Sequence, residues 1–212
     1  MGKYEELLAK AKGLPPVPTA VAHPCEATAL AGAVEAHGLG LIAARLVGPS
    51  AKIREVAAQA RLDLKGIEIV DAEHSHAAAE KAVALVREGK AELLMKGSLH
   101  TDELLAAVVA RETGLRTARR ISHVYILDVP TYHKVIMITD AAINIAPSLE
   151  DKVDICQNAV DLARTLGIAT PKVAVLAAVE TVNSKMPATI EAAASGRSRM
   201  NSPPPAARSS EK

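Results

Sequence analysis

Three residues of different chemistry stand in a row where an apolar segment gives way to a helical pattern. Lys96, Gly97 and Ser98 follow the strand pattern of residues 92–95, and the helical pattern begins at Thr101. Backbone N–H groups at a helix start carry partial positive charge, and a lysine adds a full one. The turn therefore predicts an anion-binding site, with ordinary capping of the helix by Ser98 or Thr101 as the alternative.

A second cluster of candidate residues is cationic. Arg116, Arg119 and Arg120 precede a β-rich stretch that begins at residue 122. Guanidinium groups form paired hydrogen bonds with phosphate oxygens, so Arg119 and Arg120 are candidates for clamping a phosphate. A solvated basic connector is an equally good interpretation of the same residues.

Polar side chains also stand at the ends of two further apolar stretches. Asp140 closes residues 134–139, and Asn144 lies inside the apolar run that follows, where its amide needs a partner. Asn183 belongs to a polar group after residues 172–179. Open α/β sheets bind ligands at the carboxyl ends of their strands, so these three residues are candidates for lining a cleft. Helix capping and turn stabilisation are the structural alternatives.

Helices and strands alternate along most of the chain. Helical patterns cover residues 4–12, 26–37, 50–60, 74–87, 101–112, 149–166 and 187–194. Strand patterns cover residues 39–47, 67–70, 92–95, 122–129, 134–139 and 172–179. The alternation predicts an α/β fold with a mainly parallel sheet in three α/β/α layers, and residues 122–139 predict an antiparallel hairpin attached to it.

Composition divides the chain into three parts. Residues 1–22 predict a short helix and a Pro-rich link at 14–18, and residues 23–194 form the α/β region, which could span one domain and part of a second. Residues 195–212 contain almost no apolar side chains and three consecutive prolines, so they predict a disordered tail.

The composition of the whole chain excludes several classes of protein. Hydrophobic residues make up 49%, with no Phe or Trp and three Tyr, which argues against recognition by aromatic stacking. Basic and acidic residues number 25 and 24, which excludes a strongly basic nucleic-acid surface. Cys25 and Cys156 suit neither a disulfide framework nor a metal site, and no segment has the pattern of a signal peptide or a membrane span. We therefore expect a soluble, cytoplasmic protein that binds no nucleic acid, membrane or metal.

Four segments together resemble the phosphate acetyltransferase and phosphate butyryltransferase family. They are LLMKGSLHTDELL at 93–105, SHVYILDVP at 122–130, ITDAAINIAPSLEDK at 138–152 and VAVLAAVETVNSKMPATIEAAA at 173–194. The similarity is greatest to the butyryltransferase-like branch, which includes bifunctional enoyl-CoA hydratase/phosphate acetyltransferases, and it covers residues 23–194.

The resemblance implies a reaction in which acyl-CoA and inorganic phosphate give an acyl phosphate and free coenzyme A. It implies no metal and no cofactor beyond coenzyme A as substrate or product, a homodimer, and a fold related to isocitrate and isopropylmalate dehydrogenases. Lys96, Gly97, Ser98, Arg119 and Arg120 then become candidates for contacting the phosphates of the substrates, and Asp140, Asn144 and Asn183 for lining the cleft.

The sequence departs from this family after Ala194. The family continues there with a Gly-rich segment and a DGPLAFD-like motif, and later with a Ser-Arg pair and an acidic residue that are assigned to thiol activation and phosphate binding. None of these follows Ala194, and Ser198-Arg199 has the wrong neighbours. The expectation is a truncated or frameshifted chain with an incomplete fold, unassigned catalytic residues and impaired activity.

Two alternatives to an active transferase stay open. One is an inactive structural remnant that pairs with an intact subunit. The other is a metal- and NAD-dependent dehydrogenase relative on the same fold, against which the lack of an aspartate cluster after the strands argues.

Overall fold

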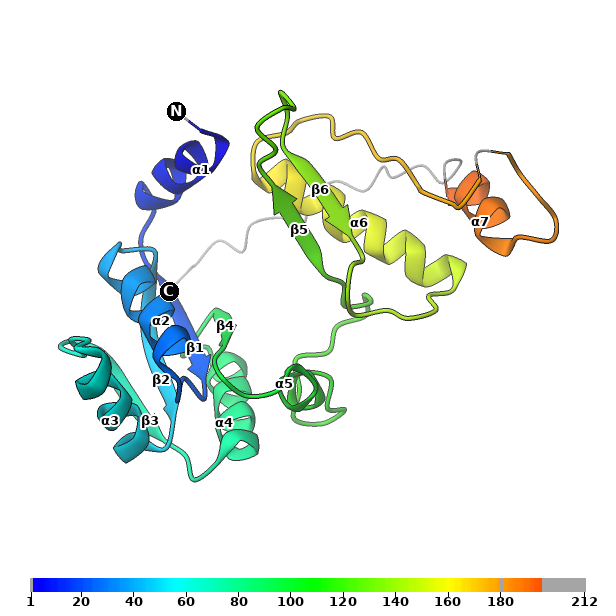
Figure 1. Ribbon diagram of the computed structural model, residues 1–212. Helices are drawn as coiled ribbons and strands as arrows, with labels where there is room; N and C mark the ends of the chain where they lie inside the picture. The colour runs from blue at the N-terminus through cyan, green and yellow to red at the C-terminus, as the bar shows by residue number, and fades with distance from the viewer. Residues whose placement is uncertain (1, 180, 196–212) are drawn as a thin grey trace, which may run out of the picture. The chain divides into compact units, whose positions relative to one another are not determined.

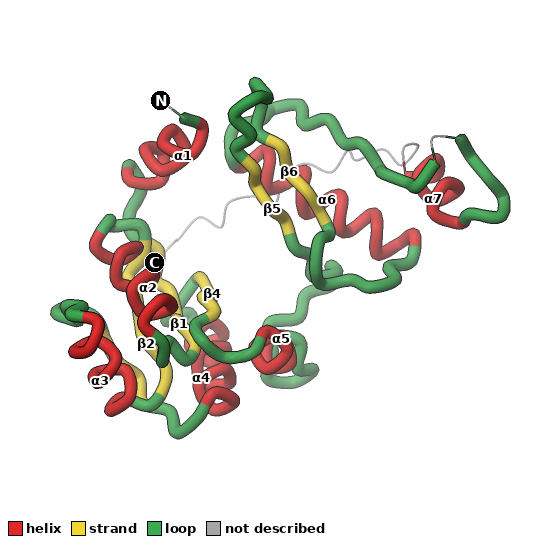
Figure 2. The backbone as a smooth tube through the Cα atoms, in the orientation of Figure 1, coloured by secondary structure: helices red, strands yellow, loops and turns green. Residues whose placement is uncertain are grey.

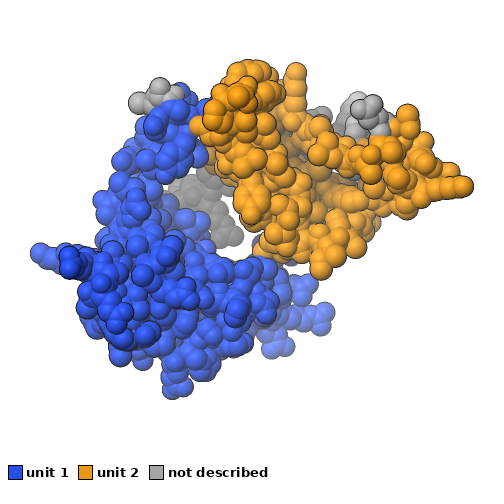
Figure 3. All heavy atoms as spheres, viewed as in Figure 1, with its two compact units in different colours: residues 1–117 blue, residues 118–212 orange. Residues whose placement is uncertain are grey.

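The computed structural model describes residues 2–179 and 181–195, which form two compact units. Unit 1 comprises Met1–Thr117 and unit 2 comprises Ala118–Lys212, coloured separately in Figure 3. Each unit has its own sheet and its own helices, so each is described by itself.

Unit 1 is built on a parallel sheet of four strands. The strands are β1 (Val17–Ala22), β2 (Ile42–Gly48), β3 (Glu68–Asp71) and β4 (Leu93–Lys96), and their order across the sheet is β3-β2-β1-β4 (Figures 1 and 2). In the centre, Thr19 of β1 pairs with Ala44 of β2 on one side and with Leu93 of β4 on the other. The last four residues of β1 are all buried, as expected for a strand covered on both faces.

Helices cover both faces of this sheet. On one face, α2 (Ala27–Gly38) and α3 (Ser50–Ala60) pack on β1 and β2 through a core that includes Leu30, Leu46 and Ile53. On the other face, α4 (Ser75–Arg87) and α5 (Thr101–Val108) form a core rich in small side chains, namely Ala20, Ala22, Ala78, Ala79 and Ala82. Burying Leu30, Leu46 and Ile53 completely stabilises unit 1 by about 1.5–3 kcal/mol each.

The first helix of the chain differs from the others. Helix α1 (Lys3–Lys12) precedes the sheet and contains no buried residue. A link that includes Pro15 and Pro16 joins it to β1.

Unit 2 combines a two-stranded antiparallel sheet with two helices. Strands β5 (Val124–Leu127) and β6 (Ile136–Thr139) pair in the register Val124 with Thr139. Helix α6 (Leu149–Thr165) buries Ile155, Cys156, Val160 and Ala163, and α7 (Pro187–Ser195) follows a long loop. The Ser148 side chain caps α6 by accepting a hydrogen bond from the Asp151 N–H group.

The observed architecture confirms the predicted α/β fold with a mainly parallel sheet and the predicted hairpin. Kinship with isocitrate dehydrogenase-type folds stays a prediction, and the predicted disordered tail lies outside the described residues except at its first residue, Ser195. No helix in the described ranges is both long and apolar enough to cross a membrane.

Three parts of the chain differ from the sequence-based expectation. Residues 14–18 were expected to be a link, yet Val17 and Pro18 open the central strand β1. Pro18 lacks an N–H group, but its carbonyl accepts a hydrogen bond from the Glu92 N–H group at 2.8 Å, so a proline is tolerated near the start of the strand.

Residues 172–179 were expected to be a strand and form none. Among the described residues, β5 and β6 pair only with each other and leave this segment without a partner strand. Its apolar side chains are correspondingly exposed, with Leu176 at 88%. Helix α5 is also shorter than expected, because the Gly114 N–H group turns back to the Ala110 carbonyl and Leu115 to Val108.

Candidate functional site

The strand order of unit 1 singles out one edge of its sheet. The chain leaves β1 into α2 on one face and leaves β4 into α5 on the opposite face, although β1 and β4 are neighbours. Connections that diverge in this way leave a crevice at the carboxyl ends of the two strands, where open α/β sheets bind their ligands. Lys96, Gly97 and Ser98 lie at this point.

The turn after β4 is fastened to the end of β1. The Gly97 N–H group donates to the Ala22 carbonyl at 2.8 Å and the Ser98 N–H group to the His23 carbonyl at 2.9 Å. The Ser98 hydroxyl also donates to the His23 carbonyl, at 2.7 Å, and accepts from the Cys25 N–H group at 3.0 Å. The two strand-end loops are therefore one hydrogen-bonded structure.

Only glycine fits at position 97. A Cβ atom there would lie 2.4 Å from the Ala22 carbonyl oxygen and 2.6 Å from the His23 carbonyl carbon and oxygen. These are backbone atoms of the central strand and its extension, so they cannot move aside as a flexible side chain would. The glycine predicted to contact an anion thus allows close approach of two backbones.

These contacts determine which groups of the turn are still able to bind an anion. The N–H groups of Gly97 and Ser98 and the Ser98 hydroxyl are engaged within the protein, and the Glu103 carboxylate occupies the start of α5 by accepting from the His100 N–H group at 3.2 Å. The Lys96 ammonium is exposed and contacts the Gly97 carbonyl at 3.2 Å. Of the three predicted residues, Lys96 is the one that presents positive charge to solvent.

His23 is a residue at this edge that the sequence analysis missed. Its backbone is left-handed, with φ of 51°, and its Nδ1 atom is buried without a hydrogen-bond partner in the described part of the chain. Burial lowers the pKa of His23, although Glu103 and Glu26 act to raise it, so the imidazole is neutral at neutral pH. The sequence signal for His23 was a His-Pro pair directly after an apolar run. This signal was missed because the apolar run was not recognised as the strand β1.

Unit 2 organises its strand-end loop around the carboxylate of Asp140. Asp140 Oδ1 accepts from the His123 N–H group at 2.9 Å, and Oδ2 accepts from the Asn144 N–H group at 2.7 Å. The Asn144 side-chain amide donates to Asp140 Oδ2 and to the Ile121 carbonyl at 3.0 Å. Partial burial acts to raise the pKa of Asp140, but hydrogen bonds from His123, Asn144 and Ala142 together lower it below its ordinary value.

The two adjacent arginines connect this loop to α6. Arg120 Nε donates to Asn144 Oδ1 at 2.7 Å and lies 3.6 Å from Asp151 Oδ1. Arg119 donates to the Asp161 carboxylate at 2.7 Å. The Arg120 side chain is 53% exposed, and its described contacts use Nε.

Three of the predicted residues thus form one continuous set of contacts, which we name the Asp140 network: Asp140, Asn144 and Arg120. Arg119 is tied to α6 beside it. Asn183 has no described contact with the network, because its hydrogen bonds run to Lys185 and Met186 in the turn before α7 and to Thr189 in the first turn of α7. Lys96, Gly97 and Ser98 belong to unit 1, and the expectation that they share one crevice with the unit 2 residues stays a prediction.

Fold and site together define an α/β protein of the doubly wound type, with cationic side chains at the ends of its strands. Residues 75–197 match the family model described as phosphate acetyl/butaryl transferase, which is more than half of the chain. The chain therefore belongs to the phosphate acetyl/butaryl transferase family.

Individual relatives agree with this assignment. A phosphate acetyltransferase of Rhizobium meliloti is 62% identical over 192 residues, which cover 91% of this chain and 61% of the relative. A phosphate butyryltransferase of Clostridium acetobutylicum is 37% identical over 190 residues, covering 90% of this chain and 63% of the relative. The chain thus spans about three fifths of the length of these curated relatives.

Solved structures show the same fold. A branched-chain phosphotransacylase from Enterococcus faecalis V583 superimposes with a TM-score of 0.67 at 27% identity, over 84% of this chain and 62% of that one. A phosphotransacetylase from Streptococcus pyogenes gives a TM-score of 0.71 at 15% identity, over 85% and 65% of the two chains. The second likeness concerns the fold alone.

Proposed function

We propose that this chain serves the transfer of a short acyl group between coenzyme A and inorganic phosphate. The observation that carries the proposal is the family match over residues 75–197. In the reaction a phosphate oxygen forms a bond to the thioester carbonyl carbon, the C–S bond breaks, and the sulfur leaves with the electron pair as coenzyme A. Both substrates are anions that need cationic partners.

Lys96 and Arg120 are the groups that we assign to those anions. Both present exposed positive charge beside the end of a strand, and charge-assisted contacts to phosphate are about twice as strong as neutral hydrogen bonds. Asp140 and Asn144 act on Arg120 indirectly: Asn144 holds Arg120 Nε, and Asp140 holds Asn144. They are positioning residues.

The experiment measures binding and turnover separately with the purified chain. Calorimetry gives the Kd of acetyl-CoA and butyryl-CoA, and formation of acyl phosphate from each ester and phosphate gives turnover. Lys96→Gln and Arg120→Gln should each raise the Kd about tenfold, which corresponds to about 1.4 kcal/mol for one charged contact.

Matched controls make the same Lys→Gln and Arg→Gln changes at other positions. Lys65→Gln and Arg54→Gln alter exposed cations of unit 1 that make no described side-chain ion pair, and we expect both to bind like the parent chain. If the parent chain neither binds a CoA ester nor forms acyl phosphate, the proposed function is wrong. If all four variants bind alike, the assignment of Lys96 and Arg120 is wrong while the function stands.

We also infer a homodimer and a cytoplasmic location, both of which rest on the family resemblance and on the composition. Sedimentation of the purified chain tests the dimer, and cell fractionation tests the location.

A further inference from the structure

His23 adopts a backbone conformation that its local sequence opposes. Its φ angle of 51° is left-handed, a region that residues with a Cβ atom rarely enter. Pro24 follows directly, and a residue before proline favours an extended backbone instead. Such conformations persist where tertiary contacts impose them, and they cluster at ligand-binding sites.

Hydrogen bonds on both sides of the residue fix the backbone of His23. Its N–H group donates to the Val47 carbonyl at 2.7 Å. Its carbonyl accepts from the Ser98 hydroxyl at 2.7 Å, and from the N–H groups of Ser98 and Cys25 at 2.9 Å each. Pro24 is fully buried. The contacts connect the ends of the neighbouring strands β2, β1 and β4, so they hold His23 at the carboxyl edge of the sheet.

The two nitrogen atoms of the His23 ring have different surroundings. Nδ1 is buried without a hydrogen-bond partner in the described part of the chain, whereas Nε2 is not buried in this way. Burial also lowers the pKa of His23, so the neutral ring carries one N–H group at neutral pH. Because buried N–H groups without a partner are rarer than buried acceptors without one, the proton belongs on Nε2. The accessible nitrogen of His23 is therefore a donor and not a base.

The charged groups at this edge of the sheet suit an anionic oxygen. Lys96 pairs in register with Ala22, the residue directly before His23, and its side chain is exposed. Since neighbouring strands lie about 4.8 Å apart, Lys96 and His23 belong to the same pair of strand ends. Glu26 also acts on His23, but it is exposed, so solvent and salt screen its charge.

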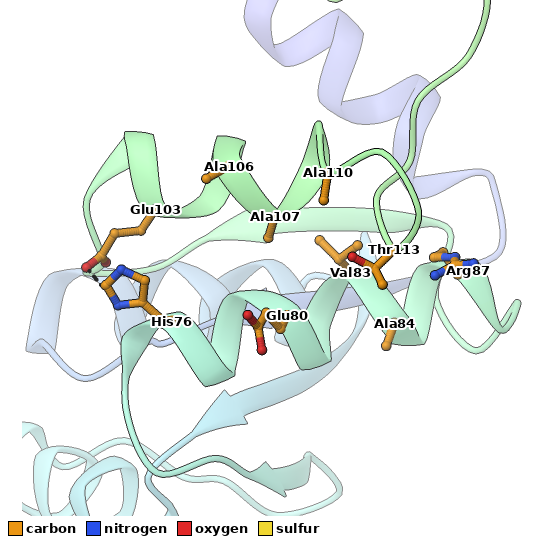
Figure 4. Close-up of a pocket in the computed structure, with 10 residues that line it drawn as sticks. All are labelled: His76, Glu80, Val83, Ala84, Arg87, Glu103, Ala106, Ala107, Ala110 and Thr113. Carbon is orange, nitrogen blue, oxygen red and sulfur yellow. Dashed lines mark ion pairs between the residues drawn. The ribbon is translucent and has the colours of Figure 1, made fainter.

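The carboxylate of Glu103 also acts on His23, but donors around it engage its charge. It accepts from the Ser75 hydroxyl at 3.2 Å and from the His100 N–H group at 3.2 Å. It also lies 3.4 Å from His76 Nδ1, and Figure 4 shows Glu103 of α5 and His76 of α4 directed toward each other. The negative charge of Glu103 is therefore held against α4, which reduces its repulsion of an anion at the strand ends.

We propose that His23 is a ligand-binding residue of the crevice at the ends of β1 and β4, where its Nε2–H group donates to a phosphoryl oxygen beside Lys96. The assignment rests on the proposed function and adds a neutral donor to the cation already assigned there. A neutral donor orients a phosphoryl group without the cost of burying a second charge. The phosphoryl group belongs either to inorganic phosphate or to coenzyme A, and the experiment separates the two.

Two substitutions of His23 distinguish its ring nitrogens. Asparagine reaches about as far as Nδ1 and tolerates the left-handed backbone, whereas glutamine reaches about as far as Nε2 and can donate there. We expect His23→Asn to raise the Kd about tenfold, as the loss of one hydrogen bond to a charged group would. His23→Gln should retain most of the affinity that His23→Asn loses. Calorimetry at about pH 7.5 with inorganic phosphate and, separately, with coenzyme A shows which of them carries the oxygen.

His74→Asn is the matched control for His23→Asn. His74 is exposed at the cap of α4, where its Nδ1 accepts from the Ala77 N–H group at 3.2 Å, and asparagine also caps helices well. We expect this variant to bind both probes like the parent chain. A loss of affinity equal to that of His23→Asn would contradict a specific role of His23.

Nuclear magnetic resonance of the parent chain reads the proton position directly, so this measurement does not depend on the folding of a variant. Long-range proton–nitrogen spectra should show the proton of His23 on Nε2. The Nε2 signal should shift when inorganic phosphate or coenzyme A is added. The ring of His74, whose Nδ1 accepts a hydrogen bond, provides the reference for this tautomer.

Three outcomes would overturn the assignment of His23 and leave the proposed function standing. The first is a proton on Nδ1, and the second is a His23→Asn chain that binds both probes like the parent chain. The third is a His23 ring whose signals stay unchanged while a probe saturates the parent chain. A parent chain that binds neither probe and forms no acyl phosphate would instead contradict the proposed function, and the assignment of His23 with it.

Discussion

Two strand-end loops of this molecule are held by different chemistry. In unit 1 the turn after β4 is fastened to β1 by hydrogen bonds from main-chain N–H groups and a serine hydroxyl, and Gly97 allows the two backbones to touch. In unit 2 the loop after β6 is fastened by an ionised carboxylate, with Asp140 at its centre and Arg120 at its rim. Neutral backbone contacts tolerate changes of salt and pH, whereas a carboxylate must stay ionised to accept several N–H groups.

The largest expected effect comes from a substitution at Gly97. Gly97→Ala places a methyl group within 2.6 Å of backbone atoms of Ala22 and His23. We expect a loss of about 3 kcal/mol in the free energy of unfolding, at the upper end of overpacking effects. Urea denaturation followed by circular dichroism measures this loss.

The matched control for Gly97 is another glycine of unit 1. Gly32 lies within α2, and a Cβ atom there meets nothing within 4 Å. Gly32→Ala should raise the free energy of unfolding by about 0.5–1 kcal/mol through helix propensity. Equal effects of the two substitutions would contradict the close approach at Gly97.

A smaller effect is expected from removing one charge in unit 2. Asp140→Asn keeps the size of the side chain but replaces one of the two accepting oxygens by an NH2 group that cannot accept, so the N–H group of either His123 or Asn144 loses its acceptor. We expect a loss of about 2 kcal/mol, the cost of leaving a partly buried donor unsatisfied. Hydrogen exchange of residues 121–144, resolved by mass spectrometry, should become faster.

Glu150→Gln provides the control for Asp140, because Glu150 is an exposed acid of unit 2 in the first turn of α6. Its effect on exchange in the same segment should be within error. Unchanged protection of residues 121–144 in Asp140→Asn would show that the network does not hold this loop.

The smallest expected effect is on the pH dependence of stability. Although the contacts of the unit 1 turn are neutral hydrogen bonds, unit 1 should lose stability at a higher pH than unit 2. Burial lowers the pKa of His23 in the folded state, so the unfolded chain binds a proton first as the pH falls. Stability from this group is therefore present above about pH 6.5, the unfolded pKa, and is lost below it. The pKa of Asp140 is also lowered, so its contribution is lost only below about pH 4.

Denaturation midpoints measured between about pH 7.5 and pH 5.5 test the contribution of His23 to stability. His23→Asn removes the titrating group while asparagine tolerates the left-handed backbone, and it should flatten the pH dependence of unit 1. A parent chain whose midpoint rises toward pH 5.5 would contradict the assignment.

Periodicity in the sequence was sufficient for most helices and for the strand ends, but not for long-range contacts. It placed Lys96, Asp140 and Asn144 beside strand ends because apolar runs stop there. It missed β1, since Pro16 and Pro18 resemble a link, and with β1 it missed His23. It assigned a strand to residues 172–179, whose aliphatic composition suits a strand but which has no described partner.

The predicted anion contacts illustrate the same limit. Ser98 was expected to face a ligand, yet its hydroxyl bonds to the His23 carbonyl across a large sequence separation. Arg119 was expected to clamp phosphate, yet it pairs with Asp161 of α6. Residue type alone indicates which groups can bind an anion, and the tertiary contacts decide which of them are already engaged.

The position of β1 has a consequence for the order of events on the ribosome. Strand β1 is synthesised before the other strands of unit 1, whereas its second neighbour, β4, is synthesised last. The two strands pair at Thr19 and Leu93. A nascent chain that ends before β4 therefore carries the edge of β1 unpaired, at a stage when β2 and β3 are already available. Unit 1 cannot complete its sheet until β4 has left the exit tunnel, and during that interval the open edge is where a nascent chain is most exposed to chaperones and to mispairing.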